Sequence, residues 1–182
     1  MLSKEKLRIK YLNIRKKKYF EINLSFFRPF FLMLKKKLKK KDYLLAIYYP
    51  SNFEINVLKL FDLKKKNKIK TLIPSIDKKI MKFSYWKYKD TLKVNKFGLL
   101  EPIVKQSVVP DIILVPLVAF DNSKFRLGYG KGYYDRYLNK YLKKNKTIMT
   151  IGVAFSFQKY KKIPITKFDV KLDYILTEKG IQ

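Results

Sequence analysis

The segment DIILVPLVAFDNSKFRLGYGKGYYDRYL, residues 111–138, passes from an aliphatic run through a glycine-rich loop into a helical pattern. Four consecutive aliphatic residues at 112–115 predict a strand that is buried on both faces, as the strands of parallel sheets are. The pattern over 132–142 predicts a helix. A strand, a loop and a helix in this order are typical of α/β proteins with a parallel sheet.

The sequence on either side of this segment continues the alternation. Short apolar runs predict strands at 43–49, 71–74, 81–88, 147–155 and 172–177. Two helices are expected in the first forty residues, broken near Ser25 and Pro29, and another over 54–67. We therefore predict one α/β domain over residues 1–182, with three α/β/α layers around a largely parallel or mixed sheet. Such sheets bind ligands at the carboxyl ends of their strands.

The composition excludes several classes of site. The 182 residues contain no cysteine and no histidine, which excludes disulfides, thiolate nucleophiles, histidine–zinc sites and Ser-His-Asp triads. No stretch has the length and apolarity of a signal peptide or a transmembrane helix. These observations predict a cytoplasmic protein that does not use a membrane. We expect it to be a monomer.

The formal net charge of +29 suggests nucleic acid as a partner, but the distribution of the charge does not. Lysines are spread along the whole chain, as in KKKLKKK at 35–41, and arginine occurs five times. Lys, Ile, Phe, Tyr and Asn, which are all frequent, share A/T-rich codons. We interpret the charge as nucleotide bias acting on surface positions and predict no specific nucleic-acid partner. A basic nucleic-acid-binding module remains the alternative.

Half of the glycines of the chain lie in the loop that precedes the predicted helix. They are Gly128, Gly130 and Gly132. Such spacing permits positive φ angles and lets backbone N–H groups approach an anion, next to the positive end of a helix. Arg126 and Lys131 add full charges, and Asp135 in the first helical turn is placed to hold a Mg²⁺ ion against phosphate oxygens. The loop therefore predicts a phosphate site.

A purely structural interpretation of the same loop is a glycine-rich turn between a strand and an amphipathic helix. Tyr134 and Leu138 then face the core, and Asp135 only complements the helix dipole. The spacing matches neither the Walker pattern nor the dinucleotide-binding pattern. Glycine spacing alone leaves these two interpretations open.

The longer string resembles a known family. VPLVAFD followed by RLGYGKGYYDRYL is similar to the signature of 5-formyltetrahydrofolate cyclo-ligases. Further blocks match in order along the chain: Lys4 and Arg8, YPSNFE at 49–54, IPSIDKKIMKF at 73–83, FGLLEP at 97–102, IGVAFSFQ at 151–158 and DVKLDYILTEKG at 169–180. The loop at 50–53 lacks the usual glycine, Asn56 replaces a common acidic residue, and residues 15–41 match nothing in the pattern.

The resemblance implies an ATP- and Mg²⁺-dependent closure of 5-formyltetrahydrofolate to 5,10-methenyltetrahydrofolate. It implies catalytic roles for Arg126, Lys131 and Asp135. ATP contacts are implied for Lys4, Arg8, Arg126, Gly128, Gly130, Lys131, Gly132, Tyr133 and Tyr134. Folate contacts are implied for Tyr49, Glu54, Met81, Phe97, Tyr133 and Tyr134. Asp135 and Asp169 are the implied magnesium ligands.

Each of these assignments has a simpler alternative. Lys4 is one solvated lysine among many, Asp169 caps a turn, and Glu54 begins a helix. The aromatic and methionine side chains at 49, 81, 97 and 134 belong to the core. A member of the family that has lost catalysis and is kept for binding is a further alternative, against which the intact block from Arg126 to Asp135 argues.

Overall fold

The computed structural model describes residues 2–37, 42–63, 68–95, 98–103, 106–143 and 147–182. The helical elements are α1 (Lys4–Lys18), η1 (Leu24–Phe27), α2 (Arg28–Lys37), η2 (Val57–Lys59), α3 (Leu60–Leu63), α4 (Tyr133–Leu142) and η4 (Ser156–Gln158). The strands are β1 (Asp42–Ala46), β2 (Lys68–Asp77), β3 (Ile80–Tyr85), β4 (Leu92–Val94), β5 (Leu100–Pro102), β6 (Ile112–Pro116), β7 (Ala119–Phe120), β8 (Arg126–Leu127), β9 (Met149–Val153), β10 (Tyr174–Thr177) and β11 (Gly180–Ile181).

Seven strands form one sheet in the order β11-β10-β9-β6-β1-β2-β3. The five inner strands run parallel, whereas β3 and β11 pair antiparallel at the two edges, so the sheet is mixed and mostly parallel. The aliphatic run of β6 lies at the centre. Because side chains alternate along a strand, Ile112 and Leu114 face one side of the sheet and Ile113 and Val115 face the other.

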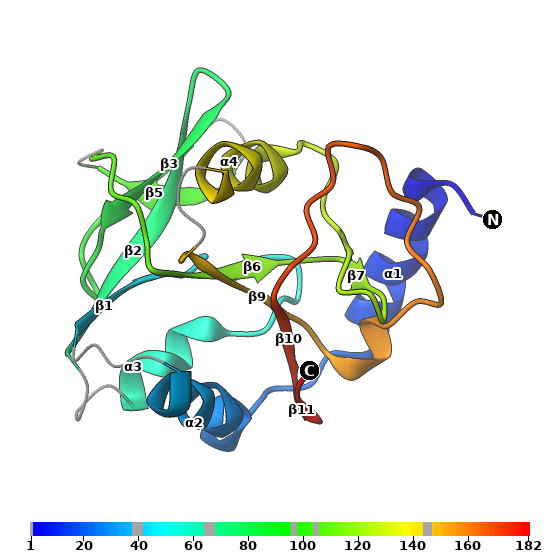
Figure 1. Ribbon diagram of the computed structural model, residues 1–182, viewed down its shortest axis with the longest axis horizontal. Helices are drawn as coiled ribbons and strands as arrows, with labels where there is room; N and C mark the ends of the chain where they lie inside the picture. The colour runs from blue at the N-terminus through cyan, green and yellow to red at the C-terminus, as the bar shows by residue number, and fades with distance from the viewer. Residues whose placement is uncertain (1, 38–41, 64–67, 96–97, 104–105, 144–146) are drawn as a thin grey trace.

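Helices cover both faces and give the three predicted layers. The face with Leu114 packs against η1 and α2 through Phe27 and Phe30. The opposite face packs against α4 through Tyr137 and Leu138. Figure 1 shows α2 and α3 on one side of the sheet and α4 on the other. The predicted fold class is confirmed.

Helix α1 has a different position, beyond the carboxyl ends of β6 and β9 and beside β7 (Figure 1). Ser3 caps its first turn by accepting a hydrogen bond from the amide of Lys6. Its apolar side chains Leu7 and Tyr11 pack on Val118 and Leu127, in a cluster separate from the two cores of the sheet. The basic side of α1 is thereby held next to the edge where a parallel sheet binds ligands.

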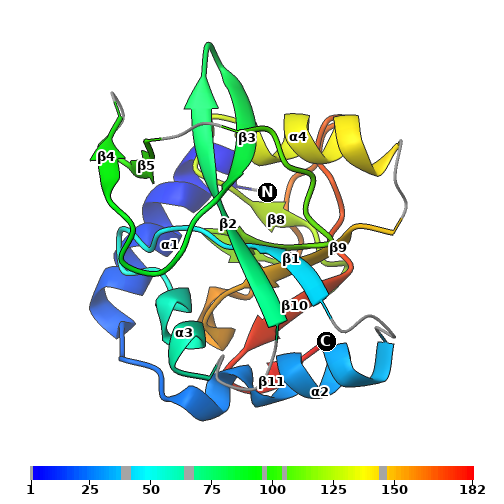
Figure 2. The ribbon, with the colours of Figure 1, turned by 90° about the vertical axis from the view of Figure 1, so that its left-hand side faces the viewer.

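Some sequence predictions differ from the structure. Within 54–63, the described part of the helix expected over 54–67, the helical residues are those of η2 and α3, because Ile55 and Val57 turn into the core where a regular helix would have to begin; residues 64–67 lie outside the described residues. The strands over 71–74 and 81–88 form a tight antiparallel hairpin, which rises beside α4 in Figure 2. Four short strands, β4, β5, β7 and β8, and the edge strand β11 were not predicted, since two or three residues show no periodicity.

Candidate functional site

One side of α1 carries three basic residues that reach the carboxyl edge of the sheet. Lys4, Arg8 and Arg15 are four and seven residues apart, which places them on one face of a helix. Lys4 Nζ lies 2.6 and 2.7 Å from the carboxylate oxygens of Asp169, and Arg8 Nε donates to the carbonyl of Gly128 at 2.9 Å. These contacts fasten α1 to the glycine loop and to the segment before β10.

The glycine loop needs glycine at two of its three positions. Gly130 and Gly132 have φ angles of +100° and +67°, which side chains rarely adopt. A Cβ at Gly132 would also lie 2.9 Å from Nη1 of Arg136, which itself donates to the carbonyl of Lys131. At Gly128 the φ angle is not positive and a Cβ would meet nothing within 4 Å. The positive φ that the glycine spacing permits is therefore adopted at Gly130 and Gly132 but not at Gly128.

A partly buried ion pair connects this loop to α4. The Arg126 side chain is 3 % exposed, and its Nη2 lies 2.8 Å from Oδ1 of Asp135. Arg126 Nη1 donates to the carbonyl of Val170 at 3.2 Å, and the amide of Val170 donates to the same Asp135 oxygen at 3.3 Å. No described residue donates a hydrogen bond to the second oxygen, Oδ2. One carboxylate oxygen of Asp135 is thus held in place while the other stays available.

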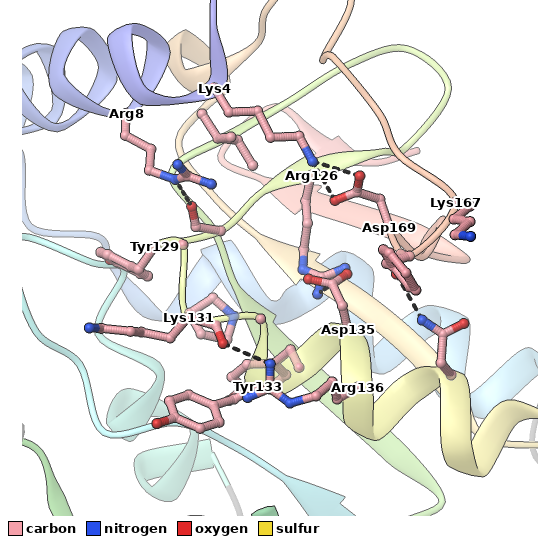
Figure 3. Close-up of a pocket in the computed structure, with 18 of the residues that line it drawn as sticks. Lys4, Arg8, Arg126, Tyr129, Lys131, Tyr133, Asp135, Arg136, Lys167 and Asp169 are labelled. Carbon is pink, nitrogen blue, oxygen red and sulfur yellow. Dashed lines mark hydrogen bonds and ion pairs between the residues drawn. The ribbon is translucent and has the colours of Figure 1, made fainter. Parts of the chain in front are cut away.

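A cavity of about 740 Å³ lies over these residues, between α1, the glycine loop and the start of α4 (Figure 3). Every residue predicted to contact ATP or Mg²⁺ lines it: Lys4, Arg8, Arg126, Gly128, Gly130, Lys131, Gly132, Tyr133, Tyr134, Asp135 and Asp169. Arg136, Lys143 and Lys167 add further cations to its wall. The N-cap residue Gly132 and the first residues of α4 line the cavity, so the amino end of that helix faces it. Gly132 has no side chain to cap the helix. The cavity suits a polyanion.

A second cavity of about 290 Å³ lies on the other side of the loop. Five of the residues predicted to contact folate line it, namely Tyr49, Glu54, Met81, Tyr133 and Tyr134. The sixth, Phe97, lies outside the described residues. Pro74, Ile76, Leu99 and Leu100 make much of the remaining wall apolar. A mostly apolar lining with a few polar groups is typical of sites that hold organic ring systems.

Glu54 is the carboxylate of this second cavity. It is 7 % exposed and accepts hydrogen bonds from the amide of Ser51 at 2.8 Å and from the hydroxyl of Tyr129 at 2.5 Å. Burial raises the pKa of Glu54, and these hydrogen bonds together with the charge of Arg15 oppose the rise. Glu54 does not begin a helix, because the chain turns helical again at Val57.

The two cavities share a wall. Pro116, Tyr129, Lys131, Tyr133 and Tyr134 line both of them. Within this wall the Tyr134 hydroxyl is buried and has no hydrogen-bond partner among the described residues. Burial raises the pKa of this hydroxyl, so it stays protonated and able to donate. A molecule in either cavity can therefore offer the partner that Tyr134 lacks.

A family model described as the 5-formyltetrahydrofolate cyclo-ligase family matches residues 3–178, almost the whole chain. The chain belongs to the 5-formyltetrahydrofolate cyclo-ligase family. The resemblance inferred from the motifs is confirmed, and the protein is an enzyme of that family, a ligase of folate-dependent one-carbon metabolism.

Individual relatives agree with this assignment. The chain is 33 % identical over 140 residues to a 5-formyltetrahydrofolate cyclo-ligase of Haemophilus influenzae, which covers 72 % of this chain and 74 % of the relative. It is 36 % identical over 134 residues to one of Mycoplasma genitalium, covering 72 % and 70 % of the two chains. The structure of the 5,10-methenyltetrahydrofolate synthetase of Aquifex aeolicus matches with a TM-score of 0.75 and 31 % identity, over 100 % of this chain and 92 % of that chain.

The two carboxylates predicted to hold magnesium in this cyclo-ligase family member differ in availability. Asp169 accepts from Lys4 with both oxygens, and its Oδ2 also accepts from the amide and hydroxyl of Thr166, so it caps a turn as well. Asp135 keeps Oδ2 without a protein donor in the described part of the chain. Mg²⁺ is commonly held by one or two carboxylates, phosphate oxygens and water, so Asp135 fits this ion. Asp169 fits better as the partner of Lys4.

Several predicted site residues make structural contacts and also line a cavity. Lys4 is paired and is not simply solvated. Met81 belongs to the core cluster under α4 and also lines the smaller cavity. Tyr134 packs partly against the same cluster, yet its hydroxyl reaches the shared wall. Met81 and Tyr134 therefore both pack against the core and line a cavity.

Sequence reasoning did not predict the cavity-wall cations Arg136, Lys143 and Lys167, nor two residues that connect α1 with the smaller cavity. Arg15 and Tyr129 connect α1 with Glu54 through consecutive hydrogen bonds. A signal for Arg15 was present: it is one of five arginines in a chain dominated by lysine, and it lies seven residues after Arg8. The position of Tyr129 between two loop glycines carried no signal of its own, since the loop pattern left that position unassigned.

Proposed function

We propose that this protein uses ATP and Mg²⁺ to convert 5-formyltetrahydrofolate into 5,10-methenyltetrahydrofolate, with release of ADP and phosphate. The observation that carries the proposal is the wall that the two cavities share. One cavity is basic and has the extent for a triphosphate, and the other is mostly apolar with a buried carboxylate. A phosphoryl donor on one side and a formyl acceptor on the other would meet at residues 129–134.

The chemistry requires transfer of one phosphoryl group. The formyl oxygen on N5 attacks the γ-phosphorus, and the bond from that phosphorus to the β–γ bridging oxygen breaks, which releases ADP. The resulting iminium phosphate carries an electrophilic carbon. The N10 nitrogen attacks this carbon and loses its proton, and phosphate leaves with the C–O bond electrons to give the methenyl bridge. Such a reaction depends on positioning and charge stabilisation rather than on a side-chain nucleophile.

The residues of the larger cavity supply that positioning for the triphosphate. Lys131 lines both cavities, so its ammonium group would stabilise the negative charge of the phosphoryl group during transfer. Arg126 fixes Asp135 through the 2.8 Å ion pair, and the Oδ2 oxygen of Asp135 would hold Mg²⁺. When bound, Mg²⁺ neutralises phosphate charge. Lys4 and Arg8 close the cavity from α1, where Lys4 is itself held by Asp169.

The residues of the smaller cavity would orient the folate. The reduced pterin ring has N–H groups along one edge, and the buried carboxylate of Glu54 is an acceptor for them. Tyr49 and Met81 supply apolar surface, and Tyr133 belongs to the shared wall. The unpaired Tyr134 hydroxyl would donate to the reacting formyl or phosphoryl oxygen. Phe97 remains a predicted folate contact.

The test is the ultraviolet absorbance of the methenyl chromophore. Purified protein with 5-formyltetrahydrofolate, ATP and Mg²⁺ should develop this absorbance in proportion to enzyme. Reactions that omit ATP, or that contain EDTA, should not develop it. Release of ADP and phosphate in equal amounts with the chromophore completes the balance. If the protein binds the folate but forms no chromophore at any ATP concentration, it is a binding protein that has lost catalysis and the proposal is wrong.

A further inference from the structure

An arginine is buried in the middle of the site without contacting either cavity directly. The Arg15 side chain is 1 % exposed, although it belongs to a helix whose other basic residues near the C-terminal end are exposed. Its Nη1 donates to the carbonyl of Leu117 at 3.0 Å, and its Nε has no partner among the described residues. Burying a guanidinium that is incompletely paired is unfavourable, so we expect an anionic group nearby that offsets the cost of burying Arg15.

This anionic group is Glu54, which the hydroxyl of Tyr129 links to Arg15. Arg15 Nη2 donates to the Tyr129 oxygen at 2.6 Å, and Tyr129 in turn donates to Oε1 of Glu54 at 2.5 Å. A guanidinium can only donate, so the Tyr129 oxygen must accept from it. The phenolic proton is then directed at Glu54. The Arg15 carbon Cζ also lies 5.5 Å from the centre of the Tyr129 ring, over its face.

We propose that Arg15 is a positioning residue that acts through Tyr129 to hold the Glu54 carboxylate in the orientation that binds folate. The inference rests on the proposed function, in which Glu54 accepts from the pterin edge. Tyr129 fixes Oε1, and the amide and hydroxyl of Ser51 fix Oε2 at 2.8 and 3.3 Å. The carboxylate is thus oriented on both oxygens before a ligand arrives, which reduces the entropy lost on binding.

The same arrangement sets the charge around Glu54. Arg15 of α1 is the buried cation that faces it, and Lys131 lines the same cavity. The remaining titratable side chains around the cavity are phenols; burial raises the pKa values of Tyr48, Tyr129 and Tyr134 further above 10, and Tyr49 and Tyr133 also line the cavity. Removing Arg15 leaves burial less opposed, so the pKa of Glu54 should rise further and the carboxylate should protonate at a higher pH.

Three variants test the role. Arg15→Met removes the buried charge at similar length, Arg15→Lys keeps the charge but cannot bond Leu117 and Tyr129 in the same way, and Tyr129→Phe removes only the linking hydroxyl. Lys16→Met, at the exposed neighbouring position, is the matched control. We expect Arg15→Met and Tyr129→Phe to raise the KM and Kd for 5-formyltetrahydrofolate by about ten- to a hundredfold, with KM for ATP within about twofold of wild type. Arg15→Lys should fall between Arg15→Met and the wild type.

Two further readouts separate positioning from mere stability. The acid limb of kcat/KM for folate should move to higher pH in Arg15→Met and Tyr129→Phe and stay in place in Lys16→Met. The double variant should weaken folate binding no more than either single change, because both break one chain of hydrogen bonds. Tyr129→Phe keeps its ring and tests the idea even if Arg15→Met does not fold. An active Tyr129→Phe enzyme with unchanged KM for folate and an unchanged acid limb would overturn the inference. If the wild-type protein forms no methenyl chromophore, the proposed function is overturned instead.

Discussion

Asp169 and Glu54 are carboxylic acids beside two neighbouring cavities, and their pKa values are shifted in opposite directions. At the larger cavity, Lys4 and the Thr166 turn surround Asp169; burial opposes ionisation, but these hydrogen bonds prevail and lower its pKa. At the smaller cavity, burial dominates and raises the pKa of Glu54 although Tyr129, Ser51 and Arg15 oppose it. Its partners stabilise the ionised form of Asp169. Burial destabilises the ionised form of Glu54 by more than its partners stabilise it.

This difference has a physical consequence for binding. The larger cavity has cations in its wall that can attract a polyanion, and its carboxylates Asp169 and Asp135 pair with two of them, Lys4 and Arg126. Under the proposed function the smaller cavity recognises a largely uncharged ring, for which a desolvated acceptor is more selective than an exposed one. Stability is therefore given up at Glu54 and retained at Asp169.

The largest effect is expected at the larger cavity, from Asp135→Asn. The amide keeps an oxygen for Arg126 but loses the charge that would hold Mg²⁺, so kcat should fall by about a hundred- to a thousandfold. The buried guanidinium of Arg126 loses its counter-charge, so the melting temperature should fall as well. Steady-state kinetics over a magnesium series measures the effect, with the exposed Asp62→Asn as control. Near-normal kcat at saturating Mg²⁺ would remove Asp135 from the metal site.

Arg126→Lys sharpens the assignment at the same cavity. The guanidinium bridges Asp135 and the Val170 carbonyl, a geometry that an ammonium does not reproduce. We expect a loss of about ten- to a hundredfold in kcat, with a smaller change in the KM for ATP. If Arg126 acts only by placing Asp135, excess Mg²⁺ should restore kcat. If it contacts the transferred phosphoryl group, no magnesium concentration should do so, and an unchanged kcat would exclude both roles.

The two cavities also differ in how far the sequence could predict them. The larger one is formed mostly by residues 126–136, a continuous segment whose glycines and arginines carry a phosphate pattern of their own. The smaller one combines residues from 48–54, 74–81 and 129–134 with Asn95, Leu99 and Leu100, which only the sheet order brings together. The family blocks supplied Tyr49, Glu54 and Met81, but no spacing rule could connect Arg15 to Glu54. The helix predicted from residue 54 begins later than expected, at Val57, for a related reason, since tertiary packing of Ile55 and Val57 overrides local helical spacing.

A smaller and mixed effect is expected at the shared wall, from Tyr134→Phe. The hydroxyl is buried without a protein partner, so its removal should leave the melting temperature of the ligand-free protein unchanged or slightly higher. If the hydroxyl donates to the reacting oxygen, kcat should fall by about tenfold. Thermal unfolding and steady-state kinetics on one preparation test both parts. A lower melting temperature with unchanged kcat would show that Tyr134 is a core residue only.

The smallest effects should appear in the pH dependence of stability, with opposite signs for the two carboxylates. Because the pKa of Asp169 is lowered from 3.8 on folding, its ionised form stabilises the protein above that value, and the contribution is lost as the pH falls through the folded-state pKa. Asp169→Asn should therefore be less stable than wild type at pH 7, by about 1 kcal/mol or about 2–4 °C, and the difference should shrink toward pH 3.

The pKa of Glu54 is raised from 4.5, so the folded protein binds its proton more readily than the unfolded chain does, and ionisation of Glu54 lowers stability as the pH rises. Relative to wild type, Glu54→Gln should gain stability as the pH rises above about 4.5 and through the raised folded-state pKa of Glu54, while its KM for folate rises. Thermal unfolding of the wild type and both variants from pH 3 to pH 8 compares the two trends directly. Their slopes relative to wild type should differ in sign, since the asparagine variant loses ground as the pH rises and the glutamine variant gains it. Slopes of the same sign would mean that Glu54 is stabilised by its partners just as Asp169 is, and that the smaller cavity holds its carboxylate without loss of stability.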